Sequence, residues 1–320
     1  MDVCPCFEQQ NNHMTLVALT GAIELGLIFA LIAMGIFVSY RILGIADLTV
    51  EGSFTAGAAV SAVFIVAGRP FIGIIMAVLV GAASGLCSAF LQTKMRVQPI
   101  LAGILTMTAL YSVSLGIMGG RPNIHLLLDD TLFDIFGRFF ENRGTIRMLL
   151  PLFFASLTGL TLSVFFHTRL GLAIRATGDN EAMVRASSIN SNITKSVGLA
   201  IGNAVTALSG GLIAQYQGFA DINMGFGMVV VALASLFVGE TLFGRRSVVW
   251  NICAVSVGAV IYRIILALAL SFRLNPANLR AVSALIVAVA ISYPAIKDRW
   301  IMLRLRYKHK KSQKSGGHNA

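Results

Sequence analysis

Long apolar stretches constrain this chain more than any other feature of its sequence. Nine of them approach the roughly 20 apolar residues that a helix needs to cross a bilayer. Of the 320 residues, 56% are apolar and only 12% are charged, too few to give a soluble enzyme a polar surface. We therefore predict an all-α polytopic membrane protein with about nine (eight to ten) transmembrane helices. The stretches are 15–39, 50–67, 71–92, 99–118, 148–166, 197–216, 226–243, 248–271 and 279–296.

The sequence carries no pattern of residues that indicates catalysis, nucleotide hydrolysis or metal binding. It has no glycine-rich phosphate-binding loop followed by lysine, and its five histidines show no metal-ligand spacing. We therefore predict no catalytic residue, no cofactor and no metal site. Cys87 and Cys253 fall within apolar stretches, and we expect both in the protein core.

Basic residues in the loops indicate which way the chain faces, because cytoplasmic loops carry an excess of Lys and Arg. We place the N-terminus (1–14) outside the cell and the tail (297–320) in the cytoplasm. Of the 25 Lys and Arg residues, 17 then lie inside and seven outside. Eight of the 17 belong to the tail, where anionic lipids attract them. The net charge of +11 thus reflects membrane topology, and we expect no nucleic-acid partner.

Two pairs of short matches predict an internal repeat. Residues 44–51 (GIADLTVE) match residues 218–225 (GFADINMG), and each segment precedes an apolar stretch. Residues 96–99 (RVQP) match residues 273–276 (RLNP) at nearly the same offset. The alternative is that such short segments match by chance.

The two copies of this repeat run in opposite directions in the predicted topology. Within a transmembrane domain over residues 15–296, the halves cover about 15–118 and 197–296, and an odd number of spans separates them. Transporters use such inverted repeats to open on alternate sides of the membrane. We expect Asp47 and Asp221, one in each copy, to cap the helices that follow them.

Ionisable residues within the predicted spans are candidates for a translocation path, because charges in a membrane usually face a cavity or a partner. The candidates are Glu24, Asp47, Glu51 and Arg263. Glu24 lies deepest in its span, and a buried hydrogen bond between helices is its alternative role. For Arg263 the alternative is a structural pair or a side chain that extends to the membrane surface.

The longest loop on the predicted cytoplasmic side, 167–196, contains a short predicted helix. Gly178, Asp179 and Asn180 form a turn able to cap a helix from residue 181 to 188. A short helix held between two spans transmits force from another protein. A plain solvated connector is the alternative.

Several segments of the chain resemble one family of membrane proteins. Residues 175–182 (RATGDNEA) resemble the coupling loop of the permeases of ATP-binding-cassette (ABC) importers. Residues 40–54 and 239–247 resemble the family of branched-chain amino acid and ribose permeases. Taken together with residues 262–263 and 274–276, these segments resemble the subgroup of permeases that is linked to tryptophan/tyrosine-type binding proteins.

The resemblance covers about residues 16–297 and implies a permease subunit in a bacterial inner membrane. Two such subunits, expected as a homodimer, would form the pore among membrane lipids. Separate ATPase chains would dock on the coupling loop, and an extracytoplasmic binding protein would deliver the solute. Because the pore has few charges, we expect a small metabolite such as an amino acid. An ion-coupled secondary transporter with an inverted repeat is the alternative.

The resemblance also implies roles for individual residues. The expected ATPase-coupling residues are Gly178, Asp179, Asn180, Glu181, Ala182 and Arg185. The expected contacts to a binding protein are Arg121, Arg138 and Arg143.

Two local features each allow two predictions. In the outer loop 119–147, phenylalanines such as Phe133 predict either a helix at the membrane surface or a plain solvated loop. The family often has glycine where this chain has Ser188, so we expect a different turn or a longer helix there.

Overall fold

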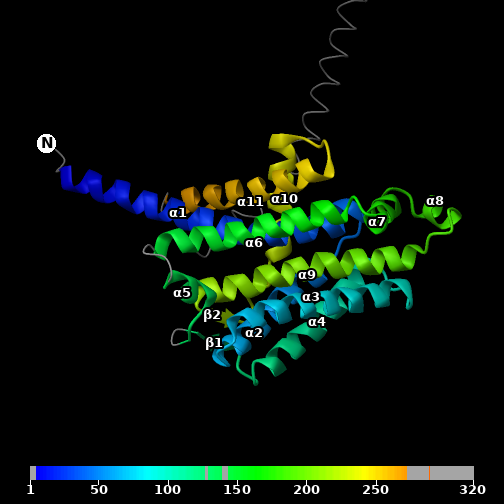
Figure 1. Cartoon of the computed structure of the whole chain (residues 1–320), viewed down its shortest axis with the longest axis horizontal. Helices are drawn as coiled ribbons and strands as arrows, with labels where there is room; N and C mark the ends of the chain where they lie inside the picture. The colour runs from blue at the N-terminus through cyan, green and yellow to red at the C-terminus, as the bar shows by residue number, and fades with distance from the viewer. Residues whose placement is uncertain (1–4, 127–128, 139–142, 272–287, 289–320) are drawn as a thin grey trace, which may run out of the picture.

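Helices make up nearly all of the structure (Figure 1). The computed structural model describes residues 5–126, 129–138, 143–271 and 288. Its elements are α1 (Pro5–Ile36), the π-helical turn η1 (Phe37–Ile42), α2 (Thr49–Val66), α3 (Pro70–Thr93), α4 (Pro99–Ile117), β1 (Asn123–His125), α5 (Leu132–Gly137), α6 (Arg143–Phe165), α7 (Arg169–Asp179), α8 (Glu181–Ala186), α9 (Ser191–Gln217), β2 (Phe219–Asp221), α10 (Met228–Phe243) and α11 (Val248–Ser271).

Seven helical segments of the described part are long and apolar enough to cross a membrane, and α10 is a shorter apolar helix. These seven segments and α10 together coincide with the first eight predicted stretches, which confirms the all-α polytopic fold. The ninth stretch, 279–296, lies outside the described residues except for residue 288. Helix α1 begins ten residues before the predicted stretch. Helix α9 begins six residues before the predicted start, because the Asn190 side chain accepts the Asn192 N–H (3.0 Å) and caps the helix.

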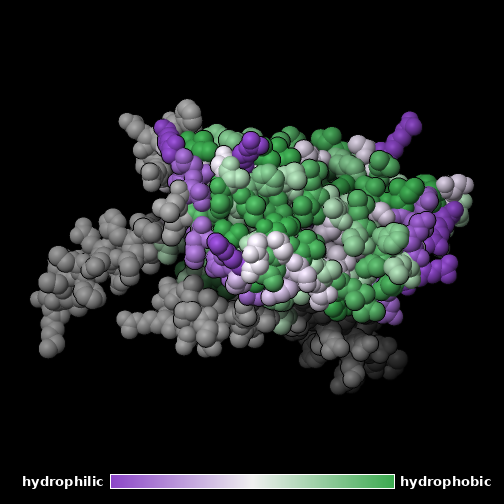
Figure 2. Space-filling view, turned by 90° about the horizontal axis from the view of Figure 1, so that it is seen from below, coloured by the Kyte–Doolittle hydropathy of each residue, from purple (hydrophilic) through white to green (hydrophobic). Residues whose placement is uncertain are grey.

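The spans divide into a central and an outer group. Helices α1, α2 and α9 are mostly buried, whereas less than half of each of α3, α4, α6 and α11 is buried. On the face seen in Figure 2, apolar side chains form a broad band between two polar ends, the distribution expected for a protein surrounded by lipid. The expectation of core positions for Cys87 and Cys253 is wrong, because both are exposed.

Small residues bring α2 and α9 into close contact. A Cβ atom on Gly57 of α2 would overlap the backbone of Ala207, and one on Gly210 of α9 would overlap the backbone of Phe54. Membrane helices gain stability from such close packing because lipid supplies little hydrophobic drive for helix association. The chain therefore uses glycine where the two central helices touch.

Two distinct ends of the bundle carry the non-spanning elements. Strands β1 and β2 pair antiparallel, with Asn123 opposite Asp221, and they lie with α5 at what we term the α5 end. Helices α7 and α8 lie at the opposite end, termed the α8 end (Figure 1). Helix α9 runs from the α8 end to the α5 end, and α2 runs parallel to it.

Candidate functional site

Helix α8 forms the tip of the α8 end, and its start is fixed by one side chain. The side-chain Oδ1 of Asn180 accepts the Met183 N–H (3.1 Å), so Asn180 is the N-cap that the sequence predicts. Gly178 and Asp179 do not belong to the turn, because both lie in the last turn of α7. The predicted coupling loop is therefore two helices joined at a single residue, with Ala182 exposed on α8.

Helix α8 ends at Ala186, two residues earlier than predicted, in a turn that requires a left-handed residue. Ser188 takes that conformation with φ of +62°. Its N–H donates to Arg185 O (3.1 Å), and the Ile189 N–H donates to Val184 O (3.2 Å), the two bonds of a Schellman motif. The expectation of a different turn or a longer helix is therefore wrong, since serine occupies the glycine conformation.

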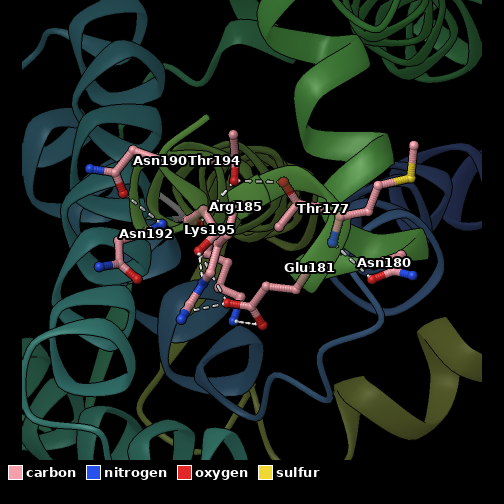
Figure 3. A network of polar contacts seen from close by, with 10 residues as sticks. Thr177, Asn180, Glu181, Arg185, Asn190, Asn192, Thr194 and Lys195 are labelled. Carbon is pink, nitrogen blue, oxygen red and sulfur yellow. Dashed lines mark hydrogen bonds and ion pairs between the residues drawn. The ribbon is translucent and has the colours of Figure 1, made fainter. Parts of the chain in front are cut away.

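Glu181 is the centre of a polar network that joins α8 to α9 (Figure 3). Its Oε1 accepts bonds from Arg185 (2.7 Å) and from the Ser191 hydroxyl (3.1 Å), and its Oε2 accepts one from Lys195 (2.7 Å). The hydrogen bond from Lys195 is the main reason that the pKa of Glu181 lies below its ordinary value. Arg185 also donates to Ser191 (2.9 Å), so the two predicted coupling residues Glu181 and Arg185 share partners on α9.

Helix α7 is packed against the break between α1 and α2. The Thr177 hydroxyl bonds the Thr194 hydroxyl (2.8 Å), which ties α7 to α9. Gly178 lies so close to Ile42 that a Cβ atom would overlap the Ile42 carbonyl oxygen. A displacement of α7 therefore reaches the backbone of η1 without any flexible side chain in between.

Asp47 lies deep in the bundle, where the chain passes from η1 into α2. Its Oδ1 accepts the Thr49 N–H (2.9 Å) at the first residue of α2, but the N-cap position belongs to Leu48, so Asp47 supports the helix start without being the predicted cap. Its Oδ2 accepts an N–H of the Asn203 side chain (2.7 Å), and Asn203 in turn accepts the Ser53 hydroxyl (2.6 Å). Asn203 lies about 18 Å along α9 from Ser191, at 1.5 Å per residue. Helix α2 thus begins inside the bundle.

Helix α10 also begins inside the bundle, and Glu51 marks the place. The Gly227 N–H, just before α10, donates to Glu51 Oε1 (3.0 Å). The C-terminal end of α10 lies near the α8 end, where Glu240 pairs with Arg41 of η1 (3.0 Å). Asp221 closes a local turn by accepting the Asn223 N–H (2.7 Å), so the prediction that it caps α10 is wrong.

Glu24 and Arg263 are both partnered within the bundle. The Tyr216 hydroxyl of α9 donates to Glu24 (2.7 Å), the buried hydrogen bond between helices that the sequence left as an alternative. The guanidinium of Arg263 lies 3.7 Å from the centre of the Phe29 ring, a cation–π contact. Neither residue is among those that line the cavity beside Glu51.

The α5 end holds the three arginines predicted to meet a binding protein. Arg121 is exposed next to β1, and Arg138 at the end of α5 is exposed and pairs with Asp130. Arg143 begins α6, and its side chain lies outside the described part. Residues 132–137 form helix α5 and not a plain solvated loop. Phe133 is buried, and its ring packs edge-on against Tyr216 at 5.7 Å.

A cavity of about 140 Å³ lies beside Glu51. It is formed by the start of α2, the middle of α4 and the turn before α10. Its lining residues are Glu51, Gly52, Thr55, Met107, Thr108, Tyr111, Ile222, Gly225 and Phe226. Among the four candidate translocation residues, all of which the structure describes, Glu51 is the one that lines this cavity.

Sequence reasoning missed the partners of several candidates. Asn203 and Tyr216 lie in an apolar stretch, and their polar side chains at membrane depth could have marked them as partners of an acid. The pairing of Arg41 with Glu240 had no such signal, because the two residues are far apart in the chain.

Comparison with known proteins agrees with this architecture. The model of the family described as branched-chain amino acid transport system / permease component matches residues 18–291. The chain belongs to this family. It is therefore a permease of the ABC import type and a multi-pass membrane protein.

Individual relatives narrow the comparison. The tyrosine transport system permease protein of Clostridioides difficile is 35% identical over 262 residues, which cover 82% of this chain and 86% of that protein. The ribose import permease protein RbsC of Escherichia coli is 28% identical, over 90% and 87% of the two chains. A solved structure, PsaBC from Streptococcus pneumoniae in complex with Fab, shares the fold with a TM-score of 0.50 at 17% identity and covers 90% of this chain and 94% of its own.

Proposed function

We propose that this permease forms the pore of an ABC importer for an amino acid or a related small metabolite. An extracytoplasmic binding protein delivers the solute, and ATP is hydrolysed on separate ATPase chains. The relative named as a tyrosine permease supports the substrate class. The low charge of the described bundle interior supports it as well, since a strongly charged solute would find few partners there.

The arrangement of α7 and α8 is the observation that carries this proposal. Helix α8 is exposed at the tip of its end, as a docking element must be, yet Glu181 ties it rigidly to α9 through Lys195. Helix α7 contacts the backbone at Ile42 through Gly178. An ATPase that pushes on α8 would therefore move the break at which α2 begins, next to Asp47.

We infer that the α8 end faces the cytoplasm and the α5 end faces outward in a bacterial inner membrane. The N-terminus then lies outside and the basic tail inside, as the distribution of Lys and Arg predicts. The exposed Arg121 and Arg138 at the α5 end, together with Arg143, contact the binding protein in this proposal. A second copy of this chain completes the pore, as the resemblance to the permeases of ABC importers implies.

The inverted repeat remains part of the proposal. Gly44 and Gly218 both have left-handed backbones, with φ of +67° and +74°. Asp47 and Asp221 each accept the N–H two residues ahead. Helix α2 runs toward the α5 end and α10 runs toward the α8 end, and these opposite directions support the repeat.

Charge reversal at α8 tests the function. We expect Glu181→Lys and Arg185→Glu to abolish ATP-dependent uptake in proteoliposomes and to prevent co-purification of the ATPase, while the permease stays in the membrane. Arg69→Glu, an exposed charge reversal in the turn before α3, is the matched control and should transport normally.

Two outcomes would overturn the proposal. One is normal uptake by both α8 variants. The other is wild-type uptake that persists without ATP but collapses with the proton gradient, with no ATPase in the purified complex. The second result would establish the ion-coupled transporter instead.

A further inference from the structure

Glu51 lies on the wall of a cavity, whereas the Asp47 carboxylate is enclosed by Thr49 and Asn203. Glu240 is paired with Arg41 and Arg245, and Glu24 accepts the Tyr216 hydroxyl. Glu51 is half-buried, and no cationic side chain of the described residues lies within ion-pair distance of it. A carboxylate at membrane depth is costly without a cation, so such a group usually marks a functional path.

The cavity beside Glu51 has the composition of a site for an organic cation. Glu51 is the one charged residue on its wall, and the aromatic rings of Tyr111 and Phe226 line it with Met107. Aromatic faces attract ammonium groups, and a carboxylate neutralises them. Tyr111 and Phe226 are 42% and 48% exposed, so the cavity is open to the surface of the chain.

The size of the cavity limits what it holds. Its volume of about 140 Å³ is close to that of a cavity, roughly 150 Å³, that admits one benzene molecule in another protein. Its walls therefore surround one ring, or an amino group with a few carbon atoms, and the rest of a larger solute would extend through the open side.

We propose that this cavity binds the ammonium group of the transported solute, with Glu51 as its counter-ion and with Tyr111 and Phe226 against the neighbouring carbon atoms. The inference rests on the proposed function and adds a positive requirement: the solute carries an ammonium group. An amino acid or an amine meets this requirement, whereas ribose and galactose do not.

Glu51 also has a structural bond, and the experiment must separate the two roles. Its Oε1 accepts the Gly227 N–H (3.0 Å) at the start of α10. Glutamine keeps a carbonyl acceptor for this bond and removes only the charge, whereas alanine removes both. If Glu51 only caps α10, Glu51→Gln behaves like the wild type; if it binds an ammonium group, Glu51→Gln fails like Glu51→Ala.

The test measures ATP-dependent uptake into proteoliposomes that hold the complete transporter with its binding protein in excess. The probes are L-tyrosine, L-leucine and tyramine, each compared with its deaminated analogue, and also ribose and galactose. We expect the wild type to transport ammonium-bearing probes only. Glu51→Gln should lower that uptake at least tenfold, as expected for a lost charge-assisted bond, and Glu51→Asp should retain more than Glu51→Gln.

Three results would overturn the inference. They are wild-type uptake of sugars or deaminated analogues, no uptake of any ammonium-bearing probe, and full uptake by Glu51→Gln beside a failing Glu51→Ala. The uptake of every probe is therefore measured both with and without ATP. Uptake that persists without ATP overturns the proposed function, whereas the three results above overturn the inference only when they are found in the presence of ATP with an ATP-dependent transporter.

Discussion

Gly178→Ala probes the contact through which α7 reaches the spanning helices. The added Cβ atom would overlap the Ile42 carbonyl oxygen and would lie 2.8 Å from the Ile42 carbonyl carbon and 3.1 Å from Leu43 Cα. All three atoms belong to the backbone, so no side chain can rotate away. Either α7 or residues 42–43 must move.

The magnitude follows from two opposing terms. Overpacking at a tight contact costs about 1–3 kcal/mol, while replacing glycine by alanine inside a helix gains about 0.5–1 kcal/mol. The net loss is therefore between about 0 and 2.5 kcal/mol, small against a total stability of about 5–15 kcal/mol. We expect Gly178→Ala to fold, to have a lower unfolding temperature in detergent, and to hydrolyse ATP with reduced uptake.

Gly116→Ala is the matched control, because a Cβ atom on Gly116 in α4 would meet nothing within 4 Å. We expect it to unfold at or slightly above the wild-type temperature and to transport normally. If Gly178→Ala is as stable as Gly116→Ala and couples ATP hydrolysis to uptake as well as the wild type, the contact between α7 and η1 does not transmit force.

Two further predictions concern α8. Ser188→Gly should stabilise the protein by about 0.5–1 kcal/mol in equilibrium unfolding, because a left-handed backbone costs serine about 1–2 kcal/mol and glycine recovers most of it; Ser187→Gly, at φ of −84°, should show no such gain. The lowered pKa of Glu181 means that its ion pairs stabilise the folded state above the ordinary glutamate pKa of about 4 and lose this effect as the pH falls through the lower folded-state value. The difference in unfolding temperature between the wild type and Glu181→Gln should therefore stay constant from about pH 5 upward and shrink below about pH 4, and a difference that already vanishes near pH 6 would contradict this reasoning.

The sequence did not predict which single residues are buried or which residues they contact. The sequence places Phe133 in an apolar cluster of the outer loop, but only the position of Tyr216 shows that α5 packs on the bundle. Ser188 illustrates the same limit: a local rule favours glycine in a left-handed turn, yet the two Schellman bonds hold serine there.

The sequence by itself determined the membrane class, the positions of the spans and the short helix after Asn180. These features depend on the hydropathy of continuous segments and on side chains that bond their own neighbours, both of which are local properties of the chain. Only the tertiary structure decided that α2 and α10 begin inside the bundle, that Asn203 holds Asp47 and that Glu51 faces a cavity. The two hydrogen bonds join residues more than 150 positions apart in the sequence, and the cavity is formed by residues from three elements. No local sequence pattern predicts contacts between residues so far apart in the chain.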